Sequence, residues 1–180
     1  RWTEGRYVMR RATDYSRAQL TALVALRMLI GWHFLYEGIA KLINPYWTAA
    51  QYLGDAKWWF AGIFHSISTS PGALTVVDFL NTWGLIAIGL GLLLGGLTRV
   101  ATISGMVLLA LYWIANPPFP GYTYSMPREG NYIIVNKTLI ELAALVVLLY
   151  FPTGQLIGLD RLIFFKKRLR DEPSAAAAAA

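Results

Sequence analysis

Charged side chains recur at four-residue spacing inside two of the most apolar segments of the chain. Glu37 and Lys41 lie in the first of these segments, and Lys137 and Glu141 lie in the last. Residues four apart share one face of an α-helix, so each pair forms a polar stripe. Ionisable groups within a membrane-spanning helix are costly unless they are paired or hydrated, and they commonly mark a functional site. These groups could bind an anion or a polar headgroup and exchange protons with it.

The order of acid and base is reversed between the two segments, and this reversal predicts how the helices pair. If the first helix leaves the membrane after Lys41 and the last enters it before Lys137, the two lysines lie at similar depth, with each glutamate about 6 Å deeper. Antiparallel packing would then pair Glu37 with Lys137 and Glu141 with Lys41. Four further polar residues complete the candidate ligand-binding cluster at this end of the bundle: His33, Asp78, Asn81 and Asn136.

The cluster has two interpretations, which the sequence leaves open. A tetrad of two acids and two bases carries no net charge, so it could be a hydrogen-bonded network that only fixes the register of the helices. It could equally line a small polar chamber, open to the outer side of the membrane, that holds an anion or a quinone headgroup. In that chamber Lys41 and Lys137 would donate hydrogen bonds, and Glu37, Glu141 and Asp78 would exchange protons.

The sequence indicates no resident cofactor. The absence of cysteine excludes thiolate metal sites, iron–sulfur clusters of the usual kind and a cysteine nucleophile. A haem held by two histidines would need His33 and His65 at one depth, and His65 is expected in a loop outside the bilayer. We therefore expect no metal site, and we expect His33 to be hydrogen-bonded in the core or to protonate a quinone.

Four apolar segments must position the cluster. Of the 180 residues, 56% are hydrophobic and 14% are charged, whereas a soluble domain carries about 25% charged residues. A spanning helix needs about 20 apolar residues, and the candidate spans cover residues 18–43, 74–97, 100–115 and 132–151. The sequence therefore predicts an all-α integral membrane protein with four transmembrane helices in an up-down bundle.

The distribution of basic residues predicts the orientation. Eleven Lys and Arg residues lie on the side that holds both termini and the 95–99 hairpin, whereas the loops on the other side hold only Lys57 and Arg128. The positive-inside rule then places both termini in the cytoplasm. Because the basic residues flank the spans, the net charge of +6 does not indicate a nucleic-acid partner. Arg27, in the inner half of the first span, is expected to snorkel or to pair with backbone carbonyls.

The segments between and after the spans suggest membrane-surface structure. Residues 44–73 are rich in aromatic side chains and contain helix-start signals, which predict one or two short interfacial helices after the first span. An aromatic belt at the headgroup level is favoured there over a ligand lid. Residues 156–170 are interpreted as a basic amphipathic anchor. Residues 1–174 are then expected to form a single domain, and the run of alanines at 175–180 is expected to be non-native sequence and is left out of it.

Several segments resemble the DoxX-like membrane proteins. Residues 27–42, RMLIGWHFLYEGIAKL, resemble the first-helix signature of this family, and residues 77–84, VDFLNTWG, with the 95–99 hairpin, resemble the second. Residues 129–141, EGNYIIVNKTLIE, and residues 158–161, GLDR, are similar too. The resemblance covers about residues 19–165 and is most specific in its Glu-Gly-x-x-Lys and Asn-Lys-x-x-x-Glu elements.

The resemblance implies a four-helix membrane bundle in the inner membrane of a bacterium or archaeon. The family is named for subunits associated with thiosulfate:quinone oxidoreductase and terminal quinol oxidase complexes. It therefore implies a subunit of a redox-linked, quinone-associated membrane complex, with other membrane subunits as partners and a quinone or a thiosulfate-like anion as ligand. The alternative is a non-catalytic accessory subunit in which the charged cluster serves only helix packing. Whether the chain itself catalyses a reaction is left open.

Overall fold

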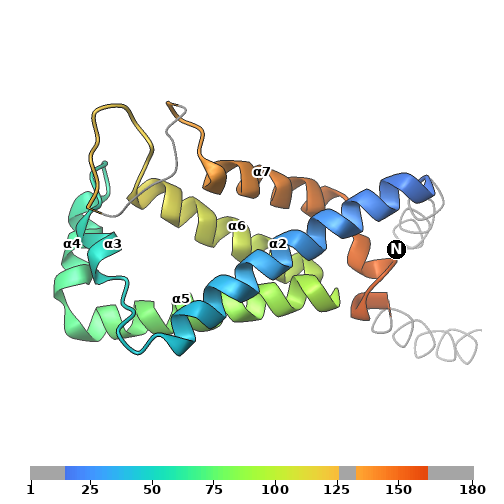
Figure 1. Cartoon of the computed structure of the whole chain (residues 1–180), viewed down its shortest axis with the longest axis horizontal. Coiled ribbons are helices and arrows are strands. Elements are labelled where there is room, and N and C mark those ends of the chain that lie inside the picture. Colours follow the sequence, from blue (N-terminus) through green and yellow to red (C-terminus); the bar gives the residue numbers. More distant parts are fainter. Residues whose placement is uncertain (1–14, 126–132, 162–180) are drawn as a thin grey trace, which may run out of the picture.

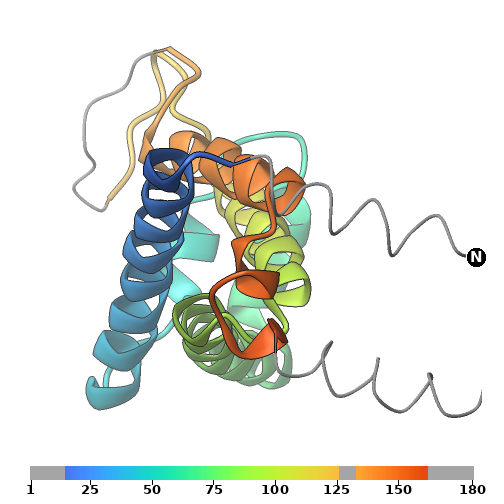
Figure 2. The ribbon, with the colours of Figure 1, turned by 90° about the vertical axis from the view of Figure 1, so that its right-hand side faces the viewer.

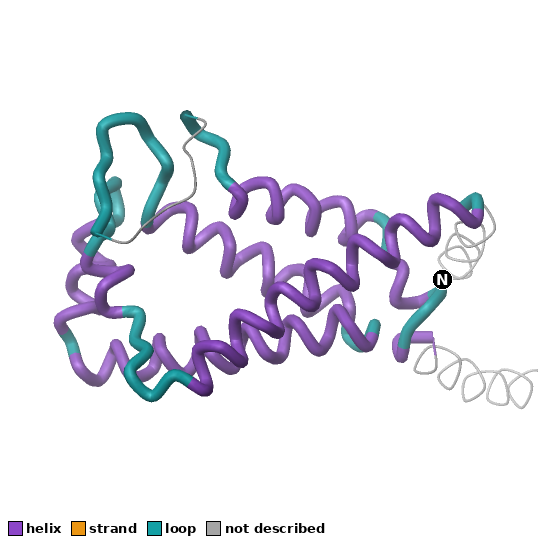
Figure 3. The backbone as a smooth tube through the Cα atoms, viewed as in Figure 1, coloured by secondary structure: helices purple, strands orange, loops and turns teal. Residues whose placement is uncertain are grey.

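The described part of the chain folds into helices joined by short turns and loops. The computed structural model describes residues 15–125 and 133–161, and Figures 1 and 3 show their arrangement. The elements in chain order are α2 (Arg17–Ile43), α3 (Ala50–Gly54), α4 (Ala61–Thr69), α5 (Pro71–Leu94), α6 (Thr98–Ala115), α7 (Lys137–Tyr150) and the short 3-10 helix η1 (Thr153–Gln155).

Within residues 15–125 and 133–161, three helices are long and apolar enough to cross a membrane. They are α2 with 27 residues, α5 with 24 and α6 with 18. For the part of the chain that the structure describes, this confirms an all-helical fold with helices that could span a membrane. Helix α7 has 14 residues and a length of about 21 Å, short of the roughly 30 Å hydrocarbon core of a bilayer. The fourth transmembrane helix therefore stays a prediction.

Helix α7 begins later than the predicted span of residues 132–151. Ile133 has a positive φ of 67°, a left-handed conformation that a helix does not contain. Asn136 is the N-cap, and its side chain accepts a hydrogen bond from the backbone N–H of Leu139 at 3.0 Å. The indole of Trp113 donates to the carbonyl of Ile134 at 3.1 Å. These contacts hold residues 133–136 in a turn, while residue 132 lies outside the described part.

Helices α2 and α5 cross at close range because glycines line their contact. A Cβ atom added at Gly89 of α5 would lie 2.5 Å from the backbone N of Leu35 in α2. On the α2 side, a Cβ at Gly38 would lie 2.9 Å from the backbone N of Ile86. Side chains at these positions would push the two backbones apart, so the glycines permit a close contact typical of membrane helices.

The helices surround a core that is displaced toward the α5–α6 hairpin. Figure 2 shows α2, α5, α6 and α7 arranged around the bundle, and Figure 1 shows α2 crossing toward α5 and away from α7. At the far end from the hairpin, α3 and α4 lie across the bundle. The buried core side chains come from all four long helices: Ile30, Phe34, Leu85, Ile88, Leu92, Ala101, Leu109, Leu145 and Leu148.

The hairpin end is closed by the segment that follows α7. The Asp160 carboxylate accepts hydrogen bonds from the backbone N–H of Leu97 at 2.6 Å and of Thr98 at 2.9 Å, which caps the start of α6. The buried Arg27 guanidinium donates to the Thr153 hydroxyl at 3.1 Å and to the Ile157 carbonyl at 2.8 Å. The predicted pairing of Arg27 with a backbone carbonyl is therefore confirmed.

These contacts also involve the first residues of the segment 156–170, which was predicted to be a surface anchor. Asp160 is buried and its backbone N–H donates to the Gly95 carbonyl at 2.8 Å, so residues 156–161 are part of the packed end of the bundle. The sequence pattern missed this because the carboxylate satisfies backbone groups of a distant helix start, which hydrophobic periodicity does not report. Residues 162–170 lie outside the described part.

Two glycines of α5 provide a matched test of the α2–α5 contact. We expect Gly89→Ala to lower the free energy of unfolding by about 1–3 kcal/mol, because the new methyl group would meet the α2 backbone. Nothing lies within 4 Å of a Cβ built at Gly84, so Gly84→Ala should be neutral or slightly stabilising. Unfolding in detergent by denaturant titration measures both. Equal effects of the two substitutions would contradict this packing.

Candidate functional site

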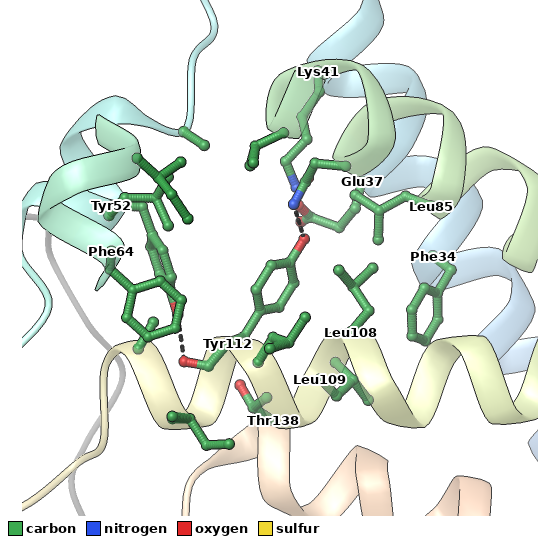
Figure 4. Close-up of a pocket in the computed structure, with 18 of the residues that line it drawn as sticks. Phe34, Glu37, Lys41, Tyr52, Phe64, Leu85, Leu108, Leu109, Tyr112 and Thr138 are labelled. Carbon is green, nitrogen blue, oxygen red and sulfur yellow. Dashed lines mark hydrogen bonds and ion pairs between the residues drawn. The ribbon is translucent and has the colours of Figure 1, made fainter. Parts of the chain in front are cut away.

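A cavity of about 920 Å³ lies between the long helices at the end that α3 and α4 close. All six described α-helices contribute to its walls. Most of the lining is apolar, and Figure 4 shows Phe34, Leu85, Leu108 and Leu109 on the side toward the core, with Phe64 facing them from α4. The cavity is therefore a largely apolar chamber set among helices that can span a membrane.

The loop between α2 and α5 is fixed over this chamber by hydrogen bonds to the long helices. Asp78 of α5 accepts from the backbone N–H of Ala49 at 2.8 Å. The Tyr52 hydroxyl donates to the Tyr112 carbonyl at 2.9 Å, and the Asn116 amide donates to the Tyr52 carbonyl at 2.9 Å. Both predicted short helices are present as α3 and α4, and these bonds hold α3 against α5 and α6.

The aromatic side chains of this loop face two ways. Tyr52, Phe60 and Phe64 line the cavity, whereas Tyr46 and Trp59 are exposed. The sequence favoured an aromatic belt over a ligand lid. In the structure, some aromatic side chains of the loop face outward, as a belt requires, and others face the cavity. Composition could not identify the aromatic residues that face the cavity. For Tyr52, the orientation depends on the contact of α3 with α6, which lies far away in the sequence.

Two charged pairs stand on the cavity wall. Lys41 Nζ lies 3.4 Å from Glu37 Oε2 within α2, and His33 Nδ1 lies 2.7 Å from Glu141 Oε1 across α2 and α7. Lys137 also lines the cavity. The Glu37–Lys41 ion pair and the His33–Glu141 hydrogen bond partly offset the cost of desolvating these groups.

This pairing differs from the predicted tetrad, in which Glu141 paired with Lys41 and Glu37 with Lys137. The reason is the course of α2, which diverges from α7 toward the α3–α4 end (Figures 1 and 2). Glu141 therefore meets His33, which lies two turns, or about 12 Å, before Lys41 on the helix. Lys41 is paired instead along its own helix with Glu37.

A third polar pair crosses the chamber between α5 and α6. The Asn81 amide donates to the Tyr112 hydroxyl at 2.7 Å. Figure 4 shows the Tyr112 ring standing in the chamber with its hydroxyl toward Glu37 and Lys41. The Asn81 carbonyl oxygen is buried without a hydrogen-bond partner among the described residues. The Tyr112 hydroxyl, which accepts this bond, keeps its own proton for donation.

The structure brings together most of the predicted cluster. Six of its eight residues line the cavity: His33, Glu37, Lys41, Asn81, Lys137 and Glu141. Asp78 and Asn136 instead bind backbone N–H groups, at Ala49 and Leu139. His65 interacts with the Ala56 carbonyl at 2.9 Å, so it stabilises the α3–α4 turn. The predicted cluster did not include Tyr52. Its only indication in the sequence was its position in a loop that is rich in aromatic residues.

The arrangement can hold a flat, mostly apolar molecule by hydrogen bonds at its edges. Donors come from Lys41 and the Tyr112 hydroxyl, and acceptors from the carboxylates of Glu37 and Glu141. Within residues 15–125 and 133–161, no three His, Asp or Glu side chains are grouped as a metal site requires. The side chains on the cavity wall can form hydrogen bonds and exchange protons within an apolar enclosure.

Comparison with known proteins identifies the family. The family model DoxX matches residues 22–116, which is more than half of the chain. The matched segment runs from α2 to the end of α6 and includes the three candidate membrane-spanning helices, the α3–α4 cap and most of the cavity lining. No curated protein and no solved structure matches the chain. The agreement of the family match with the helical architecture leads to one conclusion: the chain belongs to the DoxX family.

Proposed function

We propose that the protein is an integral membrane subunit of a redox-linked complex and that its cavity binds a quinone headgroup. The observation that carries this proposal is the placement of hydrogen-bonding pairs on the wall of an otherwise apolar chamber among candidate membrane-spanning helices. A quinone ring is flat and apolar, with carbonyl oxygens at opposite edges. Such a molecule needs apolar contact on its faces and donors at its edges.

The lining supplies both kinds of contact. Tyr52, Phe64 and Leu109 offer apolar surface for the ring faces, and Lys41 and Tyr112 are donors for a carbonyl oxygen. The volume of about 920 Å³ falls within the range of roughly 300–1,000 Å³ that is typical of small-molecule sites. A headgroup together with the first part of a tail would fill it.

The two charged pairs support a role in proton exchange. Reduction of a quinone to a quinol takes up electrons and protons together. We assign the electrons to another subunit of the complex, and the protons to the His33–Glu141 and Glu37–Lys41 pairs on the cavity wall. A small anion held by Lys41 is the second ligand that this lining would accept.

The distribution of basic residues supports the orientation of this subunit in the membrane. We place it in the cytoplasmic membrane of a bacterium or archaeon, with both termini in the cytoplasm and the α3–α4 cap on the outer side. The lipid bilayer and other membrane subunits are then its partners. The many exposed apolar side chains of α2, α5 and α6 suit contact with either.

Binding of a quinone should stabilise the protein against heat. A quinone analogue at 100 times its dissociation constant stabilises by about 2.7 kcal/mol, which raises Tm by roughly 5–10 °C for a chain of this size. Glu37→Gln should reduce this rise while the variant remains folded, because the substitution removes the carboxylate that holds Lys41 in position on the cavity wall. Arg161→Gln, which removes an exposed charge at the opposite end, should leave the rise unchanged. No shift of the wild-type Tm with any analogue would refute quinone binding.

The alternative, an accessory subunit whose charged groups serve only packing, is favoured by one observation. Glu141 and His33 already bind each other across α2 and α7, so they need no ligand to be satisfied. Under this alternative, His33→Gln and Glu141→Gln should each destabilise the bundle, and the double variant should recover about 0.5–3 kcal/mol of the summed loss. Denaturant unfolding of all four proteins measures this coupling. Additive losses would contradict a packing role for the pair.

A further inference from the structure

The cavity reaches the molecular surface along two rims of opposite chemistry. Side chains that line the cavity and still remain exposed mark these rims. On the first rim, between α2 and α7, the side chains of His33 and Glu37 are 42% and 45% exposed. Lys137 at the start of α7 also lines the cavity and is exposed. This rim is charged.

The second rim is formed by α6 and by α4 with the residue just before it. Phe60 and Ile63 line the cavity and are 46% and 60% exposed, and Leu111 of α6 lines it and is 48% exposed. No charged residue of the lining belongs to this rim. Of the other lining residues, Leu53, Asn81 and Leu85 are buried, whereas Thr48, in the loop before α3, is exposed and uncharged.

We propose that the cavity binds a tailed amphiphile in one fixed orientation, with its polar head beside the charged rim and its apolar tail leaving between α4 and α6 into the lipid. This inference rests on the proposed function and extends it: the ligand is a quinone with a long hydrocarbon tail, which reaches the cavity from the bilayer and not from water.

The proposed orientation follows from the free-energy cost of placing the hydrocarbon tail at each of the two rims. A tail that left past His33 and Glu37 would cover partly exposed polar groups with hydrocarbon and remove their hydration, which is unfavourable. A tail that leaves past Ile63 and Leu111 meets apolar side chains, which lipid can contact without such a cost. Glu37 lies six residues, or about 9 Å along the helix, before the end of α2, and Lys137 is the first residue of α7, so the long side chains of this rim extend toward the headgroup level of a bilayer.

Photolabelling of the full chain in lipid nanodiscs tests the orientation directly. One probe is a decyl-tailed quinone with a diazirine at the end of the tail, and the other carries the diazirine on the ring. We expect the tail probe to label residues of α4 or the outer half of α6, and the ring probe to label α2 or α7, by mass spectrometry of peptides. Tail labelling on α2 or α7 would overturn the proposal.

Two exposed residues of α6, one turn apart, give a matched pair of variants. Leu111 lines the cavity, whereas Val107 is similarly exposed and does not. Leu111→Asn should weaken binding of the decyl-tailed quinone by about tenfold, leave binding of the same quinone without a tail unchanged, and preserve folding. Val107→Asn should change neither affinity. Equal loss for both variants, or loss for both quinones, would overturn the proposed path of the tail.

Absence of quinone binding and a wrong orientation of the bound quinone would give different results. If neither photoprobe gives labelling that excess unlabelled quinone prevents, then the protein does not bind quinone, and the proposed orientation is wrong as well. If the ring probe labels the cavity but a tailed and a tail-less quinone bind equally well to wild type and to Leu111→Asn, then only the orientation is wrong and the headgroup site stands.

Discussion

Polar groups among membrane-spanning helices must find their partners within the protein, and this constraint organises both ends of the bundle. At the hairpin end, Arg27 and Asp160 bind backbone groups of distant segments and close the structure. At the other end, the helices diverge, and polar side chains on the cavity wall pair with one another, as Glu37 with Lys41 and His33 with Glu141. One end is therefore a packed closure and the other a chamber.

The chamber depends on how α3 and α4 are held in place. A span followed by an unattached loop would leave the diverging helices free to collapse together. Asp78 and Tyr112 instead bind the loop at Ala49 and Tyr52, so the cap remains at a distance and encloses a space. The space is apolar because the facing surfaces of α2, α5 and α6 are apolar, and its few polar pairs are the groups that a quinone headgroup could contact.

Local pattern predicted much of this architecture, and non-local contacts determined the remainder. Apolar length located α2, α5 and α6, and the spacing of charged residues located most of the candidate site. The predicted pairing of Glu141 with Lys41 failed because it assumed parallel helix axes, whereas the close contact of Gly89 with Leu35 sets the course of α2. The inward face of Tyr52 and the role of Asp160 also depend on residues far away in the sequence, which no local pattern reports.

Purification from native membranes in mild detergent, followed by mass spectrometry of the extracted lipids and of co-purifying proteins, tests the central claim most directly. The account predicts a redox complex in which quinone is retained at about one molecule per chain, and a loss of that quinone when Glu37 is replaced by glutamine. Recovery of an assembly with phospholipid alone, and no quinone traceable to this subunit, would contradict it and would leave the charged pairs as internal packing contacts.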